Sequence, residues 1–395
     1  MKPLYKMLII AGVLIVAGGA VYLAWQKLTA PAAVPEAELG MPLPAGTSGG
    51  VLPGSATSGS NEENGTPAQI QTSALILRKI SESPAFDFWV VEGTGEIYYL
   101  TPEGKVMDLK EGPDLEISTQ TLTALNRVAA APGGGRVLAA FGDPRTPQWA
   151  YFDIIDRSWH TLPQSVQTAA WAGRVDQVVA LVQNGSETNL SLLNLSQAPT
   201  AVKVVLRDVS LEDITMWFQN PEQFIISERP SAYYASRVWR LDLKTLSFNS
   251  VFTPERGLLI TPVRNGEAAL KWSGDRLFVL DHDFGHSEEL PFSTFPEKCT
   301  ASPDMLYCFV PRDPFPGNLP LPDAYFQNKF HTVDSLITAP FPSSSLPLGK
   351  SESPWASTAD TPVDAKNPVY LNGSIYFINR YDNYIYKLTL GTAGN

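Results

Sequence analysis

The stretch KCTASPDMLYCFVP, residues 298–311, has the layout of a tight β-hairpin and contains both cysteines of the 395-residue chain. The turn at Pro303–Asp304 joins two short apolar segments. Proline favours such turns because its ring fixes the backbone angle φ, and aspartate favours them because its side chain accepts hydrogen bonds from the backbone of the turn. Cys299 and Cys308 are equidistant from this turn, so we expect them to lie directly opposite each other on antiparallel strands. This hairpin is the clearest copy of a pattern that recurs along the chain.

The recurring pattern consists of strand-like segments rich in Val, Ile, Tyr, Phe and Trp, separated by turns of Gly, Pro, Asn and Asp. A turn leads into a very apolar strand, and an alternating strand that ends in Asp or Asn follows. Copies begin near residues 127, 167, 213 and 298, a further copy fills 257–292, and the segments 86–109 and 367–390 flank them. Four-stranded units of about 40–46 residues, repeated about seven times, predict an all-β fold, a β-propeller of about seven blades. Six or eight blades, or two tandem β-sandwiches, are the alternatives.

Ring closure follows from the strand count of the last unit. A four-stranded sheet leaves both faces apolar, and a ring of such sheets buries each face against a neighbour. The unit at 367–390 has only three clear strands. We therefore expect residues 71–78, QTSALILR, to supply the fourth strand of the last blade and to close the ring.

Two hairpins carry a resemblance to a known repeat. The segments TASPDMLYCFV (300–310) and APGGGRVLAAF (131–141) resemble the repeat of TolB-type propellers, in which an S-P-D-G turn joins the first two strands of a blade. The segment RVWRLDLKTLSF (237–248) is similar to the outer hairpins of the same families. Met305 stands where the turn glycine would be, and the Gly-His and Trp-Asp signature of tryptophan-aspartate repeats is absent. The resemblance implies a TolB-type or tryptophan-aspartate-like propeller fold, and a fold does not imply a function.

The N-terminal region predicts the compartment. Residues 7–25, MLIIAGVLIVAGGAVYLAW, contain no charge and as a helix would cross the hydrocarbon core of a bilayer. Lys2 and Lys6 precede this span, so the positive-inside rule places residues 1–6 in the cytoplasm and the C-terminal part outside it. We expect a single-pass signal anchor in the cell membrane, and a cleaved signal peptide is the alternative.

Composition separates a linker from the folded part. Residues 26–70 are rich in Pro, Gly, Ser and Ala and contain no aromatic residue, which predicts a disordered linker before a propeller at 71–395. Without the three lysines that precede residue 28 and the four glutamates of the linker, the remainder keeps 26 basic and 36 acidic residues. This acidic balance opposes binding to nucleic acid.

Residues suited to catalysis or metal binding are scarce. The folded part has no phosphate-binding glycine loop, no G-x-S-x-G elbow and no H-E-x-x-H motif. In DHDFGHSEE (281–289), His282, Asp283 and His286 are weak candidates for metal ligands. A polar turn between the third and fourth strands of a blade is the favoured interpretation, so we assign no metal, no cofactor and no catalytic residue.

The most unusual segment is PRDPFPGNLPLPDAYFQNKF, residues 311–330, which interrupts the sixth unit after its second strand. Long loops in compact domains are either functional or disordered. Because aromatic residues alternate with conformationally fixed prolines, we expect an ordered binding loop. Its contacts with a partner would come from Phe315, Tyr325, Phe326 and Phe330. A packed insertion that covers the edge of a blade is the alternative.

Together these features predict a membrane-tethered, extracytoplasmic binding or scaffolding module of the cell envelope, with a protein, peptide or glycan as its partner. A propeller hydrolase or lyase that acts on envelope polymers is the alternative, and it would need titratable groups at the central funnel. Outside the cytoplasm Cys299 and Cys308 would form a stable disulfide. Two reduced, buried thiols are the other interpretation of the pair.

Overall fold

The computed structural model describes residues 75–390, apart from 198–199, 212, 221, 342–351 and 359. The predicted anchor at 7–25, the linker at 26–70 and residues 71–74 lie outside the described residues. Ile70–Asn395 form one compact unit. Within the ranges described, no helix is both long enough and apolar enough to cross a bilayer.

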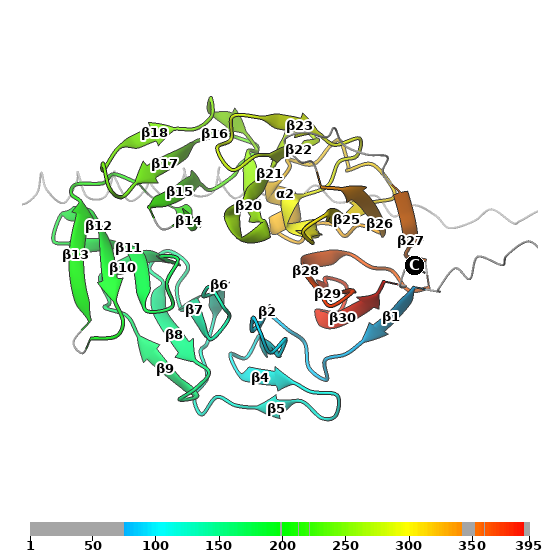
Figure 1. The fold of residues 1–395 in the computed structure, drawn as a ribbon, viewed down its shortest axis with the longest axis horizontal. Coiled ribbons are helices and arrows are strands. Elements are labelled where there is room, and N and C mark those ends of the chain that lie inside the picture. Colours follow the sequence, from blue (N-terminus) through cyan, green and yellow to red (C-terminus); the bar gives the residue numbers. More distant parts are fainter. Residues whose placement is uncertain are drawn as a thin grey trace, which may run out of the picture. The chain divides into compact units, whose positions relative to one another are not determined.

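Seven antiparallel four-stranded sheets form a seven-bladed β-propeller, as predicted (Figure 1). Blade 1 consists of β2 (Asp87–Val90), β3 (Ile97–Leu100), β4 (Val106–Leu109) and β5 (Leu115–Glu116). Blade 2 consists of β6 (Leu125–Ala130), β7 (Arg136–Phe141), β8 (Gln148–Asp153) and β9 (Ser158–Thr161). Blade 3 consists of β10 (Val166–Trp171), β11 (Gln177–Asn184), β12 (Glu187–Asn194) and β13 (Ala201–Leu206).

The remaining blades follow the same order from the inner to the outer strand. Blade 4 consists of β14 (Ile214–Asn220), β15 (Gln223–Glu228), β17 (Val238–Asp242) and β18 (Phe248–Ser250). Blade 5 consists of β20 (Leu259–Val263), β21 (Ala268–Ser273), β22 (Arg276–Leu280) and β23 (Ser287–Glu289). Blade 6 consists of β24 (Cys299–Ala301), β25 (Met305–Pro311), β26 (Asp334–Pro340) and β27 (Glu352–Ala356). A separate two-stranded ribbon pairs β16 (Ala235–Ser236) with β19 (Glu255–Arg256).

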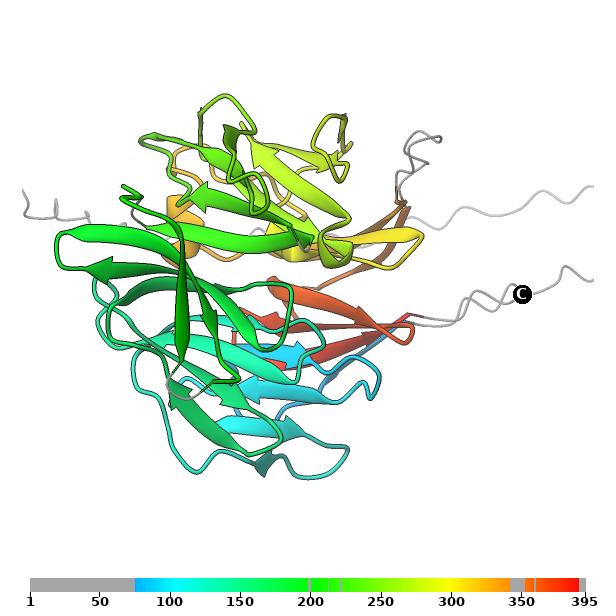
Figure 2. The ribbon, with the colours of Figure 1, turned by 60° about the vertical axis from the view of Figure 1, so that its left-hand side comes forward.

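Blade 7 joins the two ends of the propeller. It consists of β28 (Ala365–Leu371), β29 (Ser374–Asn379), β30 (Tyr384–Thr389) and, as its outer strand, β1 (Ile76–Lys79). Ile76 lies opposite Thr389 in this antiparallel pair, and the blue β1 runs beside the red β30 in Figures 1 and 2. The predicted fourth strand from the N-terminal side is therefore confirmed.

The hydrophobic cores lie between neighbouring blades. Seven clusters of buried residues each join two successive blades, from blades 1 and 2 around to blades 7 and 1. The last of these clusters packs Tyr99 of blade 1 against Ile378 and Ile385 of blade 7. Since every blade depends on both neighbours for its core, closure by β1 completes the burial of the whole ring.

The opening hairpin has the predicted geometry. Cys299 of β24 and Cys308 of β25 are direct cross-strand partners, and they form a disulfide. Both are buried in the cluster between blades 5 and 6. The disulfide interpretation of the two cysteines is thus confirmed, and the bond is part of the core.

Candidate functional site on the insertion face

One side of the ring carries the irregular segments. Because consecutive strands are antiparallel, the loops between blades and the loops between second and third strands emerge on the same side. We call this side the insertion face, because residues 312–333 lie between β25 and β26 on it. The segment contains the one-turn helix α2 (Asp323–Phe326), which follows a cis peptide bond between Leu321 and Pro322. The insertion thus interrupts blade 6 after its second strand, as the sequence predicts.

The four predicted binding aromatics differ in their exposure. The ring centroids of Tyr325 and Phe315 lie 4.3 Å and 4.7 Å from that of Phe295, which precedes blade 6. Phe330 lies 6.0 Å from Tyr325 and packs against the same core. Tyr325 is only 1% exposed, whereas Phe326 is 41% exposed. Phe326 is therefore the most exposed of the four, and the binding role of the segment stays a prediction.

Charged side chains are buried beneath the insertion, between blades 6 and 7. Lys298 ends the short helix η2 (Pro296–Lys298), and its Nζ donates to Asp334 at 2.7 Å and to Asp364 at 2.6 Å. Arg380 donates from Nη1 to Asp364 at 2.9 Å. The side chains of Lys298, Asp334 and Asp364 have no exposed surface. We call these four residues the buried ionic cluster; two cations balance two anions, and each charge needs its partners because a lone charge is costly to bury.

The buried ionic cluster fixes the insertion to blade 7. Arg380 Nη2 donates to the carbonyl oxygen of Tyr325 at 3.0 Å and to Oδ1 of Asn328 at 2.8 Å. The guanidinium carbon lies 3.8 Å from the centroid of the Tyr325 ring, a cation–π contact. The amide of Thr332 donates to Asp364 at 3.1 Å. Both α2 and the C-terminal end of the insertion are therefore bonded to the cluster.

The two carboxylates differ in their pKa values because they differ in their cationic partners. Burial alone would raise the pKa of Asp364, but Lys298 and Arg380 outweigh it and hold this pKa below its ordinary value. Burial raises the pKa of Asp334, and Lys298 opposes that increase. Asp364 therefore stays charged at neutral pH and neutralises the cations on either side of it.

Exposed aromatic side chains surround the insertion. Tyr233 and Tyr234 lie in the loop between β15 and β17, and Tyr381 follows Arg380 after β29. We call Tyr233, Tyr234, Phe326 and Tyr381 the aromatic band. Across the described ranges, Phe248 is the only other aromatic residue with such exposure.

Hydrogen bonds and ring contacts connect the insertion to the loops that carry this band. The Asp323 carboxylate at the start of α2 accepts the amide of Ala232 at 2.6 Å, beside Tyr233. At the other end of the insertion, the His331 ring stacks on Tyr381 with centroids 4.9 Å apart. The loops that carry the aromatic band therefore contact the insertion on both sides and stabilise it.

The weak metal candidates lie elsewhere. His282, Asp283 and His286 occupy the loop between β22 and β23, the two outer strands of blade 5. Nδ1 of His282 is 3.3 Å from Asp283, and Arg240 of blade 4 donates to the carbonyl oxygen of Asp283 at 2.8 Å. Nowhere in the described part of the chain are three His, Cys, Asp or Glu side chains grouped to hold a metal ion. In this position the loop makes a contact between blades.

The sequence matches no protein-family model, and a search of curated proteins found no match. Solved structures with a similar fold include the β-propeller domain of Cps50 (Swd1) from Myceliophteria thermophila, with 9% identity, a TM-score of 0.49, and coverage of 80% of this chain and 100% of that one. The tricorn protease gives 10% identity and a TM-score of 0.49 over 79% of this chain and 34% of that one. The β-propeller domain of the Trilobed protease from Pyrococcus furiosus gives 8% identity and a TM-score of 0.46, with coverage of 80% of this chain and 95% of that one. These likenesses concern the fold alone.

Proposed function

We propose that the chain is a membrane-tethered, extracytoplasmic binding or scaffolding module of the cell envelope, and that its insertion face docks a partner protein. One observation carries this proposal. Four of the five exposed aromatic side chains in the described ranges lie on loops of a single face. Aromatic residues give large contact areas with few torsions to immobilise, and they dominate the energetic centres of protein interfaces.

The rigidity of the insertion supports a binding role. Arg380 and Asp364 fix the segment to blade 7, and Asp323 fixes α2 to the loop that carries Tyr233. A surface that is already ordered loses little conformational entropy on association, so more of its contact energy appears as affinity.

The state of the titratable groups favours binding over a hydrolase or lyase reaction. Lys298, Asp334 and Asp364 are enclosed and neutralise one another. His331, 3.3 Å from Asp364, is the half-exposed residue beside them. A general acid or base must reach its substrate, and the enclosed carboxylates do not.

Two observations support the location. The uncharged span at 7–25 follows two lysines, which is typical of a signal anchor with a cytoplasmic N-terminus. The Cys299–Cys308 disulfide is of the kind that persists in oxidising compartments.

Affinity capture from the native envelope with the full chain tests the docking surface. We expect Phe326→Ser and Tyr233→Ser each to reduce the captured partner by at least about tenfold, because truncated aromatic hot spots cost roughly 2 kcal/mol or more. Phe248→Ser is the matched control, since Phe248 is 40% exposed but lies on the outer strand of blade 4. Capture that is unchanged by both band variants, or lost equally in the control, would contradict the proposal, and so would a captured glycan.

A further inference from the structure

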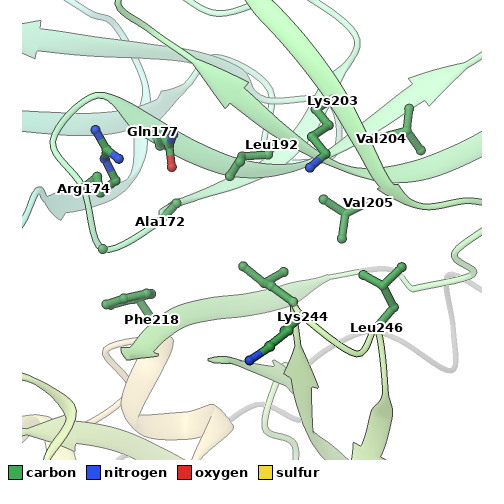
Figure 3. Close-up of a pocket in the computed structure, with 12 residues that line it drawn as sticks. Ala172, Arg174, Gln177, Leu192, Lys203, Val204, Val205, Phe218, Lys244 and Leu246 are labelled. Carbon is green, nitrogen blue, oxygen red and sulfur yellow. The ribbon is translucent and has the colours of Figure 1, made fainter. Parts of the chain in front are cut away.

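A groove opens between blades 3 and 4, on the side of the ring opposite the insertion face. Its volume is about 400 Å³, within the range of ligand-binding cavities. Figure 3 shows one wall formed by blade 3 and the facing wall formed by blade 4. The lining residues used below are Arg174, Leu192, Lys203, Val205, Lys244 and Leu246.

The groove is cationic in an acidic chain. Three of its twelve lining residues are basic and none is acidic, although the whole chain has a net charge of −11. Arg174 pairs with Asp176 at 3.2 Å. Lys203 forms no ion pair with any residue in the described ranges, and Figure 3 shows its nitrogen directed toward the space between the walls. Lys244 lies beside the Asp242 carboxylate, with which it interacts electrostatically. The electrostatic potential of the groove therefore favours a carboxylate-bearing ligand.

The outer strand beside the groove has a free edge. At Ala201–Leu206, β13 is longer than the outer strand of any other blade, and no further strand pairs with it in the part that the structure describes. Natural proteins usually protect such edges by short length or by charges. Here Val202 and Val204 are exposed, and Lys203 is the only charged residue of the strand.

We propose that an extended peptide segment of a partner protein, with alternating acidic and aliphatic residues, adds to β13 as a fifth strand of blade 3. Strand addition takes its affinity from main-chain hydrogen bonds and its specificity from the alternate side chains. Figure 3 shows the Lys203 and Val205 side chains directed toward the space between the walls, whereas the side chain of Val204, which also lines the groove, is directed away from that space. Because side chains alternate along a strand, Val202 shares the face of Val204. The acidic side chains of the added strand face Lys203, and the aliphatic ones cover the two valines.

The remaining features of the groove fit this occupant. Leu192, Val205 and Leu246 line it with aliphatic surface, against which the methylene groups of glutamate side chains pack. This site is separate from the insertion face, so the failure of either proposal leaves the other intact.

Residues 70–395 suit the test, because this segment is one compact unit and contains every strand of the closed ring. The probe is a fluorescein-labelled octapeptide of alternating Glu and Val, and its fluorescence anisotropy is measured against protein concentration. A block peptide of four Glu followed by four Val is the composition control. We expect saturable binding of the alternating peptide, at least tenfold weaker binding of the block peptide, and slower amide exchange over 201–206 in the complex.

Charge reversal identifies the site. We expect Lys203→Glu combined with Lys244→Glu to weaken binding of the alternating peptide at least tenfold. Arg145→Glu, an exposed basic residue in the loop between β7 and β8, should leave it unchanged. Far-ultraviolet circular dichroism shows whether each variant is folded.

Four results would overturn the proposal. The first is equal binding of the block peptide, and the second is amide exchange over 201–206 that the peptide does not change. The third is binding of dodecanoate at Lys203 and Lys244 without binding of the peptide, which would assign the groove to an anionic amphiphile. The fourth is a concentration-dependent dimer that Val204→Lys dissolves, which would assign the β13 edge to a second copy of this chain.

Discussion

Replacing Asp364 with asparagine removes one negative charge from the buried ionic cluster while keeping the shape of the side chain. The carboxylate accepts hydrogen bonds from Lys298 at 2.6 Å, from Arg380 at 2.9 Å and from the amide of Thr332 at 3.1 Å. In the variant two cations face one anion, in a site where the side chains of Lys298 and Asp364 have no exposed surface. The variant therefore leaves one buried positive charge without a counterion.

The expected magnitude follows from this imbalance. Removing one partner of a buried ion pair costs about 3–5 kcal/mol. The loss of two hydrogen bonds to a charged group, at roughly 1.5–3 kcal/mol each, gives a similar range of about 3–6 kcal/mol. Because a domain is typically stable by only about 5–15 kcal/mol, this change is a large fraction of the total.

Equilibrium unfolding in urea, followed by tryptophan fluorescence, measures the change in the free energy of unfolding. Limited proteolysis of 312–333 tests whether the insertion has been released. The matched control is Asp360→Asn, at an exposed carboxylate in the same connection between β27 and β28, which should change stability by less than about 0.5 kcal/mol. The double variant Lys298→Met/Asp364→Asn should recover part of the lost stability, because the cluster then holds one positive charge, on Arg380, and one negative charge, on Asp334.

Two results would refute this reasoning. One is an Asp364→Asn variant whose stability lies within 0.5 kcal/mol of the parent protein. The other is that Lys298→Met lowers the free energy of unfolding by the same amount in the Asp364→Asn variant as in the parent protein. Either would mean that the charges of the cluster are not coupled, and that the insertion is held by the packing of Tyr325 and Phe295 alone.

Three further predictions concern stability and use the same unfolding measurement. Since the pKa of Asp364 is lowered in the folded state, this residue contributes stability above its unfolded-state pKa of about 4, and that contribution is lost as the pH falls through its lower folded-state pKa; the loss below about pH 4 should therefore be smaller in Asp364→Asn. Replacing both residues of the Cys299–Cys308 disulfide with alanine should lower stability by about 2–3 kcal/mol, because the bond closes a short loop; no change would contradict a constraining role. Gly104→Ala should destabilise by at least about 2 kcal/mol, because Gly104 has a φ of +84° and an added Cβ would overlap the backbone of Leu122; the control Gly112→Ala has open space and should be neutral.

The features that the sequence predicts are those fixed by local spacing. The hairpin around Pro303–Asp304 sets the register of its strands, and that register places the two cysteines opposite each other. The closing strand also follows from counting, because a blade with three strands leaves one edge without a partner. The segment 71–78 was the nearest apolar stretch that could supply it, and β1 lies within that segment at Ile76–Lys79, apart from its last residue.

The features that the sequence does not reveal depend on tertiary contacts. The four residues of the buried ionic cluster come from separate segments at or beside blades 6 and 7, and no local spacing connects them. Tyr325 and Phe326 are adjacent aromatic residues in the same sequence context. The one-turn helix α2 nevertheless buries Tyr325 and exposes Phe326.

The position of the buried ionic cluster bears on its purpose. Buried ion pairs are poor stabilisers compared with apolar side chains of similar volume, so stability alone does not account for four charges beneath the insertion. Directional hydrogen bonds can select one backbone conformation, and Arg380 bonds to Tyr325 and Asn328 inside a segment rich in proline. If this selection places Phe326 and Tyr381 for docking, a variant whose stability has been restored by apolar substitutions should still capture its partner poorly. Capture that returns together with stability would instead make the cluster a structural support with no effect on recognition.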